Sequence, residues 1–251
     1  MNLKQSLLAP AAIAMLVYGC GPKPSGETAE TGEAMEVADA TASAETFTVD
    51  TNLSKVTWNG YKPTGKHNGT INISDGSIAV EGSAISSASF TIDITSLTVL
   101  DIPADDESNG KLTGHLMSDD FFDAENHPTA TFEVVDVAEY AADMAIEDKE
   151  QFETEFTPAS ASEIMVANPT HMITGNLTMR GVTKSVSFPA AVTLADGGVT
   201  ATANFNIDRT AWNLAYGDEA NAVDKAKDKF IYNTVNVGFE LTATAPTSAT
   251  M

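Results

Sequence analysis

The chain has 251 residues, of which 43% are hydrophobic, and it carries 13 Lys and Arg residues against 35 Asp and Glu residues. Its net charge of −22 argues against nucleic-acid binding, since phosphate contacts need clustered cations, and against adhesion to an anionic membrane surface. The length fits one domain of about 200 residues with tails, and no apolar run approaches the roughly 18 residues of a transmembrane helix.

Residues 1–19 have the pattern of a signal peptide, with a positive Lys4 followed by the short apolar stretch LLAPAAIAMLV. The next residues, LVYGC, resemble a bacterial lipobox, in which the chain is cleaved before a Cys that is then lipidated; Tyr18 departs from the usual small residue. Cys20 is the only Cys and so cannot form an internal disulfide. The alternative is ordinary secretion with an incidental thiol.

The lipobox resemblance implies acyl chains such as palmitate on Cys20, which would anchor the protein to a membrane. It also implies a location in the bacterial cell envelope, facing the periplasm or the cell surface. Gly21, in place of Asp after the Cys, favours the outer over the inner membrane.

Residues 20–45 are expected to form a flexible acidic tether. They are rich in Gly, Pro, Ser, Thr, Ala and Glu, and only Met35 and Val37 offer appreciable apolar surface. Such a composition cannot offset the entropy lost when a chain becomes ordered. A coil of this length would span on the order of 25–30 Å.

From Phe47 onwards apolar and polar residues alternate, with Thr and Ser at many polar positions. This period of two indicates strands with one apolar face. Turn signals separate the runs, namely DG at 75–76, RG at 180–181 and DGG at 196–198. At least eight strands are expected within the runs FTVD, SKVTWNG, GTINIS, SIAVEG, ASFTIDITS, TATFEVVDV, MITGNLTMRG, KSVSFPAAVTL, GVTATANFNID and NTVNVGFELTA.

These strands predict an all-β, antiparallel domain, because the long helical crossovers that join parallel strands are absent. Eight one-sided strands bury their apolar faces against one another, either as a sandwich or as a closed barrel. A closed barrel of about eight strands has room for one small apolar ligand. The alternation alone does not distinguish the two architectures.

Five segments resemble the YceI-like family, in the family's order and over about residues 46–244. They are FTVDTNLSKVTWNG, KLTGHLMSDDFFDAENHPTATFEV, ITGNLTMRGVTKSVSFPA, FNIDRTAWNLAYG and KFIYNTVNVGFELTA. The resemblance implies an eight-stranded antiparallel lipocalin-like barrel with a short helical segment and a long apolar channel. It also implies non-catalytic binding of a polyisoprenoid, quinone-like or fatty-acyl lipid. Residues 245–251 are then a C-terminal tail.

The chain departs from the family between about residues 138 and 170, where members typically have a short connection. The first part of this insertion is acidic, with Tyr140/Met144 and Phe152/Phe156 at i,i+4 spacing, which is typical of a short exposed helix. A solvated, irregular segment is the alternative. The insertion could also serve as a lid or as a docking surface for a protein partner.

The double Phe at 121–122 lies in an acidic turn directly before a strand. Because strands close the sides of a barrel but not its ends, these rings can plug an end. Ser118, Asp119 and Asp120 would cap the start of a short helical turn. Pro128 then extends the chain into a strand that begins near Thr129. Burial as ordinary core is the alternative for at least one ring.

No catalytic set is apparent in the sequence, and we expect neither an enzyme nor a cofactor. The four His residues, at 67, 115, 127 and 171, are scattered and lack a metal-binding spacing. There is no nucleophile elbow, phosphate loop or CxxC motif. Arg209 fits either a cation that meets a ligand headgroup or a structural ion pair with Asp208. Arg180 is expected to serve turn geometry.

The predicted ligand site follows from strand parity, the double Phe and the late-strand motif. It comprises Trp58, Ile71, Ile73, Phe90, Ile92, Phe121, Phe122, Phe132, Leu177, Met179, Phe188, Phe205, Arg209, Trp212, Val237 and Phe239. A continuous apolar tunnel would favour lipid binding. A filled barrel would instead favour a structural or interaction protein of the envelope. The sequence leaves the oligomeric state open.

Overall fold

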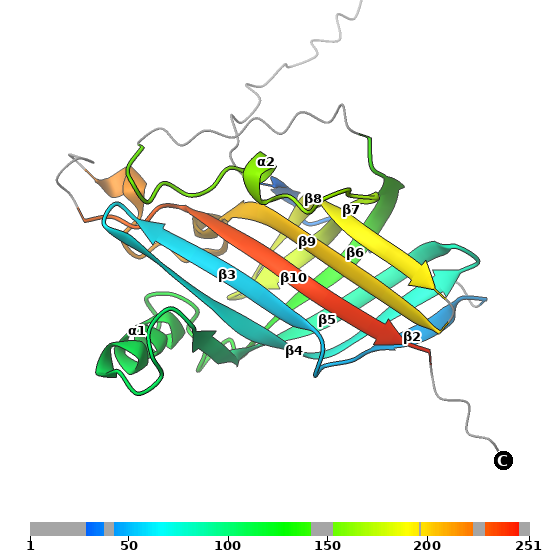
Figure 1. Ribbon diagram of the computed structural model, residues 1–251, viewed down its shortest axis with the longest axis horizontal. Coiled ribbons are helices and arrows are strands. Elements are labelled where there is room, and N and C mark those ends of the chain that lie inside the picture. Colours follow the sequence, from blue (N-terminus) through cyan, green and yellow to red (C-terminus); the bar gives the residue numbers. More distant parts are fainter. Residues whose placement is uncertain (1–28, 38–42, 142–152, 196, 223–228, 246–251) are drawn as a thin grey trace, which may run out of the picture.

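The computed structural model describes residues 29–37, 43–141, 153–195, 197–222 and 229–245. Within these ranges the strands curl into one closed antiparallel barrel, and a helix lies against the wall near one end (Figure 1). No helix in the described part of the chain is long and apolar enough to cross a membrane.

The elements follow one another in a simple order, with most strands joined to their sequence neighbours. They are β1 (Glu30–Glu33), β2 (Glu45–Val49), β3 (Lys55–Lys62), β4 (Gly65–Glu81), β5 (Ala84–Val99), α1 (Glu107–Met117), β6 (Thr129–Glu139), α2 (Ala161–Ile164), β7 (His171–Met179), β8 (Val182–Ala195), β9 (Gly198–Asp208), the 3-10 turns η1 (Arg209–Trp212) and η2 (Glu219–Asn221), and β10 (Thr234–Thr244).

Eight strands close the barrel: β3 to β10 pair in sequence order, and β10 returns to β3. The short β2 continues the position of β3, because it pairs with the far parts of both β4 and β10. Between β2 and β3 the Ser54 hydroxyl bonds the Thr242 amide and carbonyl, which replaces ladder bonds that the break removes. The predicted all-β barrel is therefore confirmed.

Two of the predicted turns have different outcomes. Arg180 and Gly181 both have positive φ, 49° and 72°, as a two-residue hairpin turn between β7 and β8 requires. The predicted turn at Asp75-Gly76 is wrong, because β4 runs through it without a break. Its register against β5 shifts at this point, so the pair marks a β-bulge. Gly76 is needed there because a Cβ would lie 2.8 Å from the Ser89 carbonyl oxygen.

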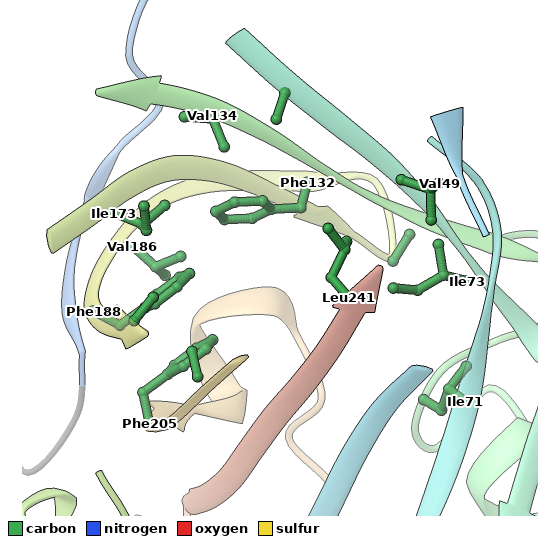
Figure 2. Packing of buried hydrophobic residues seen from close by; sticks show 14 of the residues in the cluster. Val49, Ile71, Ile73, Phe132, Val134, Ile173, Val186, Phe188, Phe205 and Leu241 are labelled. Carbon is green, nitrogen blue, oxygen red and sulfur yellow. The ribbon is translucent and has the colours of Figure 1, made fainter. Parts of the chain in front are cut away.

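The inward faces form one apolar cluster that contains every residue expected from strand parity. Figure 2 shows part of it, with Phe132, Phe188 and Phe205 pointing into the interior from three strands. Phe188 is 1% exposed and Val186 is fully buried. The alternation of apolar and polar residues was sufficient to predict these inward positions, because successive side chains of a strand point to opposite faces of the sheet.

The predicted tether is wrong for residues 29–37, which lie on the barrel. β1 pairs with Lys184–Ser187 of β8, and the Ala29 amide donates to the Asn206 carbonyl of β9 at 2.6 Å. This strand fills a gap, since β8 and β9 pair only through residues 190–195 and 198–203. The Asn176 side chain then holds the Met35 backbone by two hydrogen bonds, at 2.9 and 2.7 Å.

The described part of the insertion also packs on the barrel. α2 lies within it and begins with a capping box formed by Ser160 and Glu163. The Ala159 carbonyl accepts hydrogen bonds from two asparagines on the outer wall, Asn206 at 3.1 Å and Asn236 at 3.2 Å. Both asparagines are buried. The prediction of a solvated segment is therefore wrong for residues 153–169, which pack on the barrel. Most of the predicted helix falls on residues 142–152, which lie outside the described ranges.

Candidate functional site

The barrel interior contains an apolar cavity of about 360 Å³ at the end near α1. Pockets for small ligands typically measure about 300–1,000 Å³, so this one can hold a short chain or part of a longer one. Lys62 and Tyr216 line it and are exposed, so the cavity meets solvent at this end. We call this end the mouth.

The cavity wall comes from inward-facing residues on all strands of the barrel except β8. The residues are Val56, Trp58 and Gly60 on β3, His67 and Ile71 on β4, Ile92, Ile94 and Leu97 on β5, Ala130 on β6, Leu177 and Met179 on β7, Ile207 on β9, and Val235 and Val237 on β10. Trp58 lies over Gly69, where a Cβ would approach the indole ring to 2.7 Å. A wall of this composition favours a hydrocarbon chain.

The mouth is built by α1 and by the turn that follows it. Asp106 caps the helix by accepting a hydrogen bond from the Ser108 amide at 2.8 Å. Leu112, Leu116 and the next segment then present apolar side chains to the cavity. The short helical segment implied by the family resemblance is therefore confirmed, but its position was not predicted, because Gly110 and Gly114 interrupt an already weak apolar pattern.

Phe121 and Phe122 both line the cavity at the mouth, and Phe121 is 6% exposed. The position is the one expected of an end plug. Ser118 ends α1, where its hydroxyl donates to the His115 carbonyl at 2.8 Å, and it also begins the next turn as predicted, since its hydroxyl accepts from the Asp120 amide at 3.4 Å and its carbonyl accepts from the Phe121 amide at 3.1 Å. The prediction of a strand after Pro128 is confirmed, since β6 begins at Thr129.

Arg180 fixes the mouth, a role that the sequence did not indicate. Its guanidinium donates to the carbonyl oxygens of Asp119 at 2.6 Å, Phe121 at 2.8 Å and Asn213 at 2.8 Å. The β7–β8 turn is thereby tied to both segments that surround the opening. Planar guanidinium donors suit such a set of diverging carbonyls.

Arg209 lines the cavity, yet its guanidinium is engaged by the backbone. It donates to the carbonyls of Ile231 at 3.0 Å, Tyr232 at 3.1 Å and Leu214. Burial lowers the pKa of Arg209, which nearby Asp218 partly opposes. The guanidinium stays charged despite this, because arginine is not deprotonated in proteins. Neither predicted role fits well, since the bonds are to carbonyls.

Two histidines that the sequence left as isolated residues lie at the mouth. The Nδ1 atom of His67 is 2.8 Å from the Asp101 carboxylate, and the Nε2 atom of His115 is 3.0 Å from that of Asp120. Burial alone would raise the pKa of Asp101, but hydrogen bonds from the Asn68 amide and His67 outweigh it and lower the pKa. Aspartates thus accompany both imidazoles, and the exposed Lys62 adds a cation to the same end of the cavity.

The His115 ring also joins an aromatic group at the opening. It meets Phe121 edge-on at 5.1 Å and Tyr216 at 4.6 Å between ring centroids. The contact with Tyr216 was not visible in the sequence, because Tyr216 lies far along the chain from His115 and Phe121. Within the described ranges no group of three or more His, Cys, Asp or Glu side chains could hold a metal ion.

The predicted ligand residues divide into two groups. Those that line the cavity are Trp58, Ile71, Ile92, Phe121, Phe122, Leu177, Met179, Arg209 and Val237. The others, which belong to the packed core and do not line the cavity, are Ile73, Phe90, Phe132, Phe188, Phe205, Trp212 and Phe239. The alternation along each strand predicted which side chains point inward. It did not predict which part of the barrel interior is empty.

Comparison with known proteins agrees with this architecture. The family model described as the YceI-like domain matches residues 47–243. The chain belongs to the YceI-like family. No curated protein matches the chain.

Solved structures with the YceI-like fold come from several bacteria. BcnA of Burkholderia cenocepacia is 23% identical, with 78% of this chain and 99% of that chain covered and a TM-score of 0.54. A polyisoprenoid binding domain from Saccharophagus degradans is 20% identical, with 80% and 98% covered and a TM-score of 0.49. The YceI protein of Campylobacter jejuni is 19% identical, with 70% and 84% covered and a TM-score of 0.42.

Proposed function

We propose that this protein binds a neutral lipid with a polyisoprenoid or similar hydrocarbon chain in the barrel cavity, without catalysing a reaction. The observation that carries the proposal is the apolar cavity of about 360 Å³ that meets solvent at one end. Membership of the YceI-like family supports a binding role over an enzymatic one.

The chemistry of the wall supports a neutral ligand. Apolar surface removed from water contributes about 25 cal/mol per Å², so burial of even a few hundred Å² of chain leaves useful affinity after association costs. The two buried or mouth-forming arginines are engaged by backbone carbonyls. A net charge of −22 further disfavours an anionic headgroup.

We propose, in addition, that the protein is held in the bacterial envelope through a lipidated Cys20. The support is the sequence LVYGC after a short apolar stretch, since Cys20 lies outside the described ranges. An anchored binding protein would sit close to the membrane in which prenyl lipids dissolve.

A charged substitution in the cavity tests the lipid proposal. Ile71 lines the cavity and is 5% exposed, so Ile71→Asp would place an unpaired carboxylate against the chain. We expect the parent to bind geranylgeraniol with a micromolar or lower Kd, and Ile71→Asp to lose binding at least tenfold. Native mass spectrometry and tryptophan fluorescence, to which Trp58 in the cavity wall contributes, give independent readouts.

Asn72→Asp is the matched control, because the next residue of β4 is exposed and faces away from the cavity. It adds the same charge and should leave binding unchanged. Circular dichroism establishes that each variant is folded. A folded Ile71→Asp protein that binds as tightly as the parent would contradict the proposed site.

A further inference from the structure

We propose that a layer of five phenylalanines forms the floor of the cavity and limits the length of the lipid chain that the protein accepts. The layer consists of Phe90, Phe132, Phe188, Phe205 and Phe239. The inference rests on the proposed lipid-binding function and adds to it a determinant of chain length.

The five rings contact one another across the barrel. Phe188 and Phe205 stack, with ring centroids 4.0 Å apart and planes 2° apart. Phe239 meets Phe188 edge-on at 5.6 Å, and Phe132 is tilted against Phe188 at 5.7 Å. Phe90 in turn stacks on Phe132 at 5.8 Å. Rings from five of the eight barrel strands are thus joined in one continuous set of contacts across the interior.

The cavity ends where this layer begins. On four strands the last residue that lines the cavity is followed, two positions further from the mouth, by a phenylalanine of the layer. The pairs are Ile92 and Phe90 on β5, Ala130 and Phe132 on β6, Ile207 and Phe205 on β9, and Val237 and Phe239 on β10. No ring of the layer lines the cavity.

The surrounding structure seats the layer firmly. A Cβ at Gly175 would lie 2.3 Å from the Cζ atom of Phe132, so a glycine is required for that ring to reach its place. Phe132, Phe188 and Phe205 are buried, whereas Phe90 and Phe239 are half-buried. Close-packed interiors do not yield space without cost, so the three buried rings act as the fixed part of the floor.

A fixed floor gives a specific dependence of affinity on chain length. Each carbon added to a chain gains affinity while it is buried, and carbons beyond the capacity of the cavity stay in water at the mouth. We therefore expect affinity to rise along the series geraniol, farnesol and geranylgeraniol, and then to level off towards solanesol. Removal of a ring should move the plateau to longer chains.

Phe205→Ala is the direct test, because Phe205 is the cross-strand neighbour of the cavity residue Val237. Two or more extra methylenes buried in the new space correspond to roughly tenfold tighter binding of solanesol. Geraniol should bind as before. Affinities come from fluorescence titration and from native mass spectrometry of the folded variant.

Phe47→Ala is the matched control, since Phe47 is 7% exposed and lies on β2, in the filled part of the barrel away from the cavity. It removes the same atoms and should leave the plateau in place. Ala130→Leu is a test in the opposite direction, because it fills space instead of opening it. Ala130 lines the cavity two positions nearer the mouth than Phe132 on the same strand. The larger side chain should therefore move the plateau to shorter chains.

The outcomes separate this inference from the proposed function. If the parent binds no prenol of any length, the lipid proposal fails. If the parent binds prenols but Phe205→Ala and Ala130→Leu leave the length dependence unchanged, lipid binding stands and the phenylalanine floor is wrong. A plateau that shifts equally in Phe47→Ala also overturns the floor, because the effect would then be one of general loosening.

Discussion

Arg209 shows how a buried cation can serve structure in a cavity wall. It is 3% exposed and ties Leu214 to the segment at 231–232 through carbonyl bonds. In the sequence, Arg209 fits a headgroup contact and an ion pair equally well, since both need only a charged residue near a strand end. A hydrogen bond to a backbone carbonyl cannot be recognised in a sequence, because every residue carries this group.

Arg209→Lys should destabilise the fold although it keeps the charge. An ammonium cannot satisfy three carbonyls that a planar guanidinium reaches from one plane, and each buried acceptor left unpaired costs about 1–3 kcal/mol. We expect a loss of about 2–4 kcal/mol in the free energy of unfolding, measured by urea denaturation.

Lys111→Ala is a suitable control, because its ion pair with Glu107 is exposed on α1 and should contribute less than about 1 kcal/mol. If Arg209 instead met a headgroup, Arg209→Lys would leave stability intact and weaken only the binding of anionic lipids. That result would contradict the structural role.

Strand parity was the most predictable feature of the site at the residue scale. Alternation placed Ile71, Ile92 and Val237 on the inward face without further information. His67 and Asp101 could not be paired in advance, because 34 positions separate them and the pairing of β4 with β5, which brings them together, shifts its register at several points. The sequence thus predicted the wall but not the groups at the mouth.

At the element scale, β1 is the feature that composition concealed. Its residues, ETGE, offer almost no apolar surface, so a criterion based on burial assigns them to a tether. β1 is instead held by main-chain pairing with β8, and the side chain of Asn176 holds the backbone of Met35 just after the strand. A gap between two strands of a closed barrel leaves unpaired backbone groups, and any short extended segment can satisfy them.

A truncation should therefore destabilise the domain when it removes β1. We expect a chain that starts at residue 37 to unfold at a temperature several °C below that of a chain that starts at residue 29. A loss of about 1–3 kcal/mol corresponds to roughly 2–12 °C for a domain of this size. Differential scanning calorimetry of the two proteins measures it.

Asn176→Ala provides a point substitution for the same element, since it removes both bonds to Met35 and leaves the chain length unchanged. It should lower the melting temperature of the longer protein and have little effect on the shorter one. Equal melting temperatures for the two truncations would show that β1 adds nothing to the fold.

The whole barrel was predictable because its strands alternate over most of the chain and their order resembles one family. The division of the barrel interior into an empty cavity and a packed core was not predictable, because both parts are lined by the same kinds of residue. Phe205 and Ile207 stand two positions apart on one inward face, yet only Ile207 borders empty space. Whether a ring meets another ring or a void depends on packing across the barrel.

The pairing of β1 also changes how the molecule would sit on a membrane. With residues 29–37 held on the wall, only residues 21–28 separate Cys20 from the barrel. This stretch can span at most about 30 Å when fully extended. The barrel would therefore be held nearer to the bilayer than a flexible tether of 25 residues allows at full extension.

Cys20→Ser tests the anchor on which that geometry depends. Without the thiol no acyl chain can be attached, and a protein with a charge of −22 has no other attraction to an anionic surface. We expect the parent in the membrane fraction and the variant in the soluble envelope fraction, with unchanged melting temperature because β1 is intact. Ser25→Ala, in the same stretch, should stay with the membrane. A Cys20→Ser protein that remains membrane-bound and acylated would contradict the anchor.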